Sequence, residues 1–118
     1  MPSFSQLPEF DKELKKLSKK YPTLESDIED IKPVLLSCPT GIGKSFTIIS
    51  SSEKVKIVKV RIHCESLRGR FMRLIYAYHK DREGIKNSVE FMYIEIYFKG
   101  DKENENKERI ARYLKNVE

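Results

Sequence analysis

The sequence has no tryptophan, only two cysteines, and no long hydrophobic run. A membrane-spanning helix needs about 18 or more consecutive apolar residues, so none is expected. The first residues, MPSFSQLPEF, lack the basic-then-apolar pattern of a secretion signal. Cys38 and Cys64 form no CxxC motif and have only His63 close by in sequence, which favours free thiols over a disulfide or a metal site. We therefore expect a cytoplasmic protein with no metal, no cofactor and no membrane partner.

Charge, in contrast, is abundant and unevenly placed. The chain has 118 residues, enough for a single domain over residues 1–118, with 35% charged residues and a net charge of +5. Between Lys54 and Arg82 there are nine Lys and Arg residues against two acidic ones, Glu65 and Asp81. The flanking segments are mixed or acidic. A basic centre of this kind is typical of a zone that contacts nucleic acid.

The segment CPTGIGKS, residues 38–45, has part of the pattern of a nucleotide phosphate loop. Gly43, Lys44 and Ser45 match the second half of G-x-x-x-x-G-K-[ST], but Cys38 stands where the first glycine should be. The loop also follows a predicted helix and leads into predicted strands, whereas a phosphate loop joins a buried strand to a helix. We therefore interpret this segment as a turn.

Hydrophobic periodicity predicts an α+β fold. Phe10, Leu14 and Leu17 recur at helical spacing before the break at Tyr21-Pro22. A second helix begins after Thr23 as N-cap and has the apolar stripe Leu24, Ile28, Ile31 and Leu35, with Pro33 near its end. Strands are expected at residues 3–7, 46–50, 55–63, 70–79 and 89–98. The last helix has Ile110, Tyr113, Leu114 and Val117 on one face and Asp101 or Asn104 as its cap. We expect an N-terminal helical hairpin packed on one face of a small antiparallel sheet, with a C-terminal helix.

Strand alternation sorts the side chains of this sheet onto two faces. In residues 55–63 the apolar set is Val58, Val60 and Ile62, and the polar set is Lys59, Arg61 and His63. In residues 91–99 the apolar set is Met92, Ile94, Ile96 and Phe98, and the polar set is Tyr93, Glu95, Tyr97 and Lys99. The apolar sets are expected to face the helices, so the polar sets meet on the open face.

An open face that carries Lys59, Arg61, His63, Tyr97 and Lys99 is suited to an RNA backbone. Arginine donates forked hydrogen bonds to phosphate oxygens, lysine supplies a compact charge, and tyrosine offers a stacking surface. Like charges on adjacent strands repel unless an anion meets them. Arg68 and Arg70, in or beside the preceding loop, are further candidates for RNA binding.

The segments FDKELKKLSKKYPTLESDI, VKIVKVRI, RFMRLIYAYH and IEIYFKGDKEN, taken in this order, resemble the RelE/ParE superfamily of bacterial toxins, nearest to its RelE/HigB-like branch. The resemblance covers nearly the whole chain and implies a RelE-like fold. It also implies the toxin of a type II toxin–antitoxin system: a ribosome-dependent, metal-independent mRNA endoribonuclease, or mRNA interferase, that inhibits translation. The implied partners are mRNA on the ribosome and a cognate antitoxin protein.

The resemblance also implies the catalytic residues. The family's basic pair matches Lys59 and Arg61, its arginine in an R-[LV]-[IV]-Y strand matches Arg73, and its closing aromatic and basic pair matches Tyr97 and Lys99. Such enzymes cleave by attack of the 2′-OH on the adjacent phosphorus, so their cations stabilise the charge that builds up there. Glu95 and His63 are both candidates for the general base.

Two other functions stay open at this point. A ParE-like inhibitor of DNA gyrase would have the same fold without nuclease activity. A non-catalytic member of the fold would bind RNA or a partner protein only. The presence of Lys59 together with Arg61, and of Tyr97 beside Lys99, favours RNA as the target.

Overall fold

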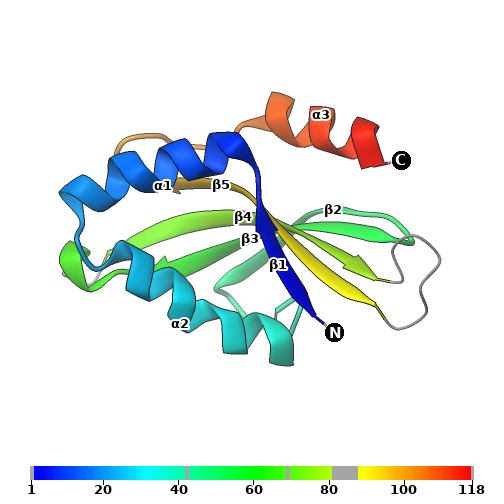
Figure 1. The fold of residues 1–118 in the computed structure, drawn as a ribbon, viewed down its shortest axis with the longest axis horizontal. Helices are drawn as coiled ribbons and strands as arrows, with labels where there is room; N and C mark the ends of the chain where they lie inside the picture. The colour runs from blue at the N-terminus through cyan, green and yellow to red at the C-terminus, as the bar shows by residue number, and fades with distance from the viewer. Residues whose placement is uncertain (1, 42, 69, 81–87, 118) are drawn as a thin grey trace.

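The computed structural model describes residues 2–41, 43–68, 70–80 and 88–117. It is a mixed α+β structure with a five-stranded sheet in the middle of the chain and helices toward both ends (Figure 1). Its elements in chain order are β1 (Ser3–Gln6), α1 (Pro8–Lys20), α2 (Leu24–Ser37), β2 (Phe46–Ser51), β3 (Val55–His63), the 3₁₀ helix η1 (Glu65–Leu67), β4 (Phe71–Lys80), β5 (Val89–Phe98) and α3 (Lys107–Val117). None of the described helices is long and apolar enough to cross a membrane.

The strand order in the sheet is β1-β5-β4-β3-β2. The strands β2 to β5 pair antiparallel with their sequence neighbours, as expected. β1, however, runs parallel to β5, with Ser3 opposite Glu90, so the expectation of a purely antiparallel sheet is wrong. The two helices that follow β1 carry the chain over one face of the sheet, and this crossover makes the parallel pairing possible.

The helical hairpin α1–α2 covers one face of the sheet (Figure 1). Phe10 of α1 and Leu24 and Leu35 of α2 are fully buried against the strands. The strand side chains of this core are those that alternation assigned to the helices, Val58, Val60 and Ile62, with Leu74 and Tyr76 of β4 and Phe91 of β5. The predicted α+β architecture, with helices toward both ends and a sheet between them, thus agrees with the structure in part.

The sequence predicted that the opposite face of the sheet is open, but the structure shows it partly covered. Ile110 and Tyr113 of α3 pack there in a second core with Ile57, Ile75 and Ala77, and with Leu114 and Val117 at its margin. The cap of α3 is also different from either candidate. The side chain of Asn106 accepts a hydrogen bond of 3.0 Å from the Arg109 amide, so neither Asp101 nor Asn104 is the cap.

A β-bulge in β5 changes the facing of several side chains. Ile75 pairs with Glu95 but Tyr76 pairs with Tyr93, which leaves Ile94 as an extra residue. Because of this shift, Tyr93 lies in the core under α1 rather than beside Glu95 and Tyr97. Met92 and Ile94 belong to the α3 side and not to the side of Ile96 and Phe98. The assignment by simple alternation is wrong for these three residues.

The described part of the segment from Cys38 to Ser45 forms turns between α2 and β2, as expected. Gly41 has φ +76°, and a Cβ there would lie 1.9 Å from Cγ of Phe46, so only glycine fits. The Lys44 carbonyl accepts a hydrogen bond of 3.2 Å from the Arg61 guanidinium. This turn therefore supports the end of the sheet where the basic residues gather. Cys38 and Cys64 are both free thiols.

Candidate nucleic-acid interface

Three predicted site residues lie in one row across the sheet. Arg61 of β3 is directly opposite Arg73 of β4, and Arg73 is directly opposite Tyr97 of β5. Lys59 lies two residues along β3, on the same face. Arg73, which only the family resemblance pointed to, therefore faces the same way as the other basic residues.

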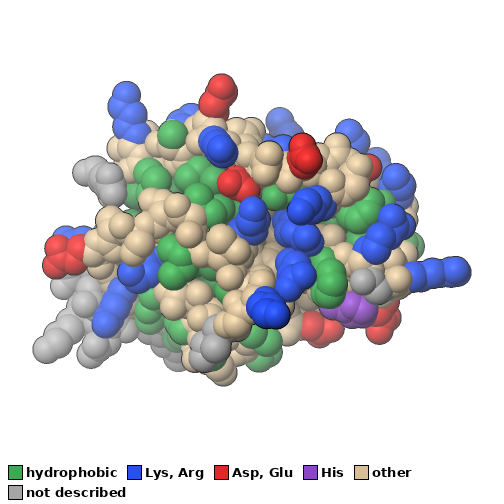
Figure 2. Space-filling model, turned by 180° about the vertical axis from the view of Figure 1, so that it is seen from behind, with side chains coloured by type: hydrophobic (Ala, Val, Ile, Leu, Met, Phe, Trp, Pro, Cys, Tyr) green, Lys and Arg blue, Asp and Glu red, His purple; other side chains and the backbone are tan. Residues whose placement is uncertain are grey.

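Four cations form what we call the cationic cluster: Arg61, Arg70, Arg73 and Lys99. Arg70, Arg73 and Lys99 line one hollow of about 320 Å³ with Phe71, Phe98 and Gly100, and Arg61 lies over Phe71. None of the four forms an ion pair with a carboxylate among the described residues. Seen from behind, the molecule shows Lys and Arg side chains gathered in a band across its surface (Figure 2). Uncompensated cations in register destabilise a sheet unless an anion binds them.

Lys59 and Tyr97 belong to the same face, but both contact residues of the link between β5 and α3. The Lys59 ammonium lies 3.0 Å from Glu105. Burial alone would raise the pKa of Glu105, but hydrogen bonds from its own backbone amide and from Lys59 lower it below its ordinary value. Tyr97 is only 5% exposed, and the Lys102 ammonium lies 5.5 Å from its ring centre. Burial, with Glu105 and Glu95 nearby, raises the pKa of Tyr97 to about 12 although Arg73 opposes the rise. A base cannot stack on Tyr97 in this arrangement.

Glu95, one of the two candidate general bases, is fully buried. One of its carboxylate oxygens accepts a hydrogen bond of 2.7 Å from the backbone N–H of Asn106, and the other forms an ion pair with Lys102. Glu95 thus holds the start of α3 against the sheet. His63 is exposed at the end of β3 and is the candidate base that solvent and a ligand can reach.

Phe71 is the residue of this site that sequence reasoning missed. It is 36% exposed and lies opposite His63 in the pairing of β3 and β4. The Arg61 guanidinium lies 5.4 Å from the centre of its ring, and the His63 ring meets it edge-on at 6.3 Å. Its position was readable: in the strand containing Arg73, the residue two places earlier shares the facing of that arginine.

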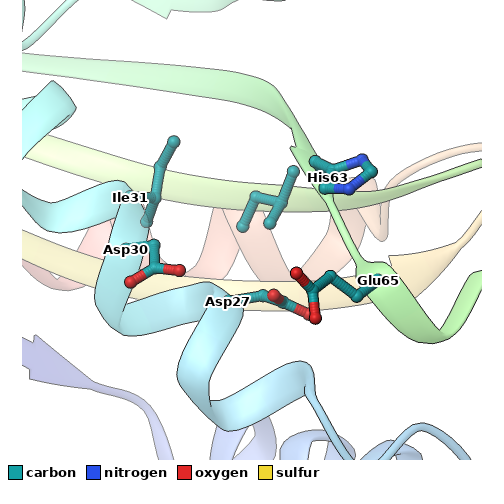
Figure 3. A pocket seen from close by; sticks show the side chains of 6 residues that line it. Asp27, Asp30, Ile31, His63 and Glu65 are labelled. Carbon is teal, nitrogen blue, oxygen red and sulfur yellow. The ribbon is translucent and has the colours of Figure 1, made fainter. Parts of the chain in front are cut away.

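His63 also borders a second hollow, of about 240 Å³, between α2 and the segment after β3. Figure 3 shows Asp27 and Asp30 on the α2 side of this hollow, with His63 and Glu65 on the other. Asp27 is already hydrogen-bonded to the hydroxyl of Thr23 at 2.9 Å. This acidic surface marks the limit of the basic face, because it would repel a phosphate backbone.

Arg68 stands apart from the cationic cluster. It closes η1 with φ +48° and is exposed, without a described contact to the hollow.

Among the described residues no group of three His, Cys, Asp or Glu side chains is arranged to hold a metal ion. No family model, no curated protein and no solved structure matches this chain.

Proposed function

We propose that this chain is a toxin of RelE-like fold that cuts mRNA on the ribosome, with the cationic cluster as the surface that binds the RNA backbone. The observation that carries the proposal is the row of Arg61 opposite Arg73, beside a hollow that Arg73 shares with Lys99 and Arg70. The order of elements, with two helices on one face of the sheet and a last helix at the end, supports the RelE-like fold at the coarse level.

The cluster suits the chemistry of cleavage by an RNA's own 2′-OH. In that reaction the 2′ oxygen attacks the adjacent phosphorus, the bond to the 5′ oxygen breaks, and a 2′,3′-cyclic phosphate remains. Negative charge grows on the non-bridging oxygens, and fixed guanidinium groups stabilise it without reorganising. Arg61 and Arg73 come from adjacent paired strands, so the spacing of their Cα atoms is fixed by the sheet. His63 is exposed at the end of β3 and is the candidate general base that a ligand can reach.

A second candidate function is RNA binding without cleavage. The observation that favours it is the engagement of Lys59 with Glu105 and the burial of Tyr97, since both residues belong to the implied catalytic set. In this case the cationic cluster would bind the phosphate backbone, and the link before α3 would keep the two other residues away from it.

The experiment is controlled expression of the full chain in growing bacteria, with translation rate and mRNA 5′ ends measured together. The proposal expects a fall in translation and cuts that follow the reading frame, and both are expected to disappear in Arg61→Ala and Arg73→Ala. Lys15→Ala, an exposed cation on α1, is the matched control and should cut like the parent chain. RNA binding in vitro without cuts would support the second candidate. Intact mRNA with DNA damage would indicate a ParE-like gyrase inhibitor and contradict both.

A further inference from the structure

The hollow in the cationic cluster is bounded by two aromatic rings as well as by cations. Phe71 and Phe98 line it, and a guanidinium lies over each ring: Arg61 is 5.4 Å from the centre of Phe71, and Arg70 is 5.0 Å from the centre of Phe98. Arginine and aromatic planes are the groups on which unpaired nucleobases stack. Phosphate binding alone needs no aromatic side chain.

Phe71 is a large apolar side chain that the fold leaves exposed at a charged surface. It is 36% exposed although it belongs to β4, whose next residue, Met72, is fully buried. Its hydrophobic area is therefore available to a ligand that combines an apolar ring with negative charge. The volume of about 320 Å³ is at the lower end of the range for ligand pockets, roughly 300–1,000 Å³, which suits one nucleotide.

Gly100 leaves room for the Phe98 ring at this hollow. A Cβ at this position would lie 2.4 Å from Cε2 of Phe98, so a side chain there would displace the ring. Gly100 directly follows Lys99, and both residues line the same hollow as Phe98.

We propose that this hollow is a nucleotide subsite in which an unpaired base stacks on Phe71 while its phosphate is bound by Arg73 and Lys99. The inference rests on the proposed function and deepens it, because it names the side chain on which a base of the RNA would stack. An RNA duplex keeps its bases stacked on one another, so it presents no free base to Phe71.

The test uses a short single-stranded RNA that carries one 2-aminopurine, a base whose fluorescence is quenched by stacking. The full chain is expected to quench it and to bind it more tightly than a duplex or an abasic analogue of equal charge. Phe71→Leu should remove the quenching and weaken binding by about five- to 150-fold, the usual cost of losing one base–aromatic stack. Phe71→Tyr, which keeps the ring, should restore both. Gly100→Ala should weaken binding because the Phe98 ring is displaced.

The control is Leu36→Ala, which changes another exposed apolar residue, on α2 and outside the hollow, and should bind like the parent chain. Equal binding of the abasic analogue with no effect of Phe71→Leu would overturn the subsite and leave the proposed cleavage intact. Quenching that depends on Phe71 in a chain that cuts no mRNA would keep the subsite and contradict the proposed function. If no RNA binds at all, both fail.

Discussion

On the face of the sheet that α1 and α2 cover, β3 and β4 supply Val58, Val60 and Leu74 to a continuous apolar core, whereas on the other face the same strands present Arg61 and Arg73. Adjacent residues of one strand thus have different roles: one packs in the core and the next lies on the charged face. The apolar face is closed and determines whether the chain folds. The second face is only half covered, and its open end carries the side chains that can bind a ligand.

The two faces also differ in how their helices are held. The hairpin packs through fully buried side chains such as Phe10 and Leu35. α3 combines a smaller apolar contact with polar ones: the Arg109 guanidinium lies 2.9 Å from Glu13 and 2.9 Å from the Ile94 carbonyl at the bulge. The Glu13 bond holds the pKa of Arg109 above its ordinary value although burial opposes it. Ion pairs and hydrogen bonds of charged groups depend on pH and salt, so the packing of α3 on the second face should be more sensitive to both than the packing of the hairpin.

The largest effect should separate the two faces within β4. Leu74→Ala removes a fully buried side chain from the core under the hairpin and is expected to lower the free energy of unfolding by about 2–5 kcal/mol. Arg73→Ala, its neighbour on the other face, should change it by about 1 kcal/mol or less, because the side chain is half-buried and has no described ion pair. Urea unfolding of both variants measures the difference. A similar fall in the free energy of unfolding for both variants would refute the distinction between a face that stabilises the fold and a face that binds a ligand.

A smaller effect is expected at the attachment of α3. Glu95→Gln removes the charge that binds Lys102 and weakens the acceptor for the Asn106 amide, at a cost of about 1–3 kcal/mol. Hydrogen exchange should quicken for the amides of α3, residues Lys107–Val117, more than for those of α1. Glu103→Gln, an exposed carboxylate in the same link, is the control and should leave both helices unchanged. Equal loosening of α1 and α3 would show that Glu95 supports the whole fold and not one helix.

The sequence was most informative where one physical signal acted alone. Alternation in residues 55–63 correctly separated Val58, Val60 and Ile62 from the basic residues, since this strand pairs without a bulge to β4. The helical stripes and the turn at residues 38–45 were equally direct. In β5 the same method failed, because one extra residue at Ile94 reverses the facing of everything before it. A bulge of this kind leaves no local pattern.

The candidate site was predictable in its cations and not in their surroundings. Lys59, Arg61 and Tyr97 were found from strand pattern and Arg73 from the family resemblance, and they share one face. Which of them is free depends on the path of the link before α3, a contact between residues 46 positions apart in the case of Lys59 and Glu105. Short-range periodicity contains no information on such contacts. For the same reason the acidic partner of Lys59 was not foreseen.

The smallest expected effect concerns that partner. Glu105→Gln removes the ion pair with Lys59, which is worth about 0.2–1 kcal/mol for a pair near the surface. Because the pKa of Glu105 is lowered on folding from an ordinary value of 4.5, its contribution is complete above that pH and disappears as the pH falls through the lower folded value. The stability difference between the parent chain and Glu105→Gln should therefore be present at pH 7 and vanish in acid. Urea unfolding at a series of pH values measures it.

The same substitution, Glu105→Gln, also tests whether the RNA-binding surface extends beyond Arg61 to Lys59. Without Glu105 the ammonium of Lys59 is free to meet a phosphate, so RNA affinity should rise and its dependence on salt should steepen by about 0.7 in logarithmic slope, the value for one more contact to a single strand. Glu108→Gln, in the first turn of α3 and exposed, is the control for the lost charge. If both substitutions change the affinity equally and leave the slope unaltered, Lys59 does not reach the RNA, and the binding surface ends at Arg61.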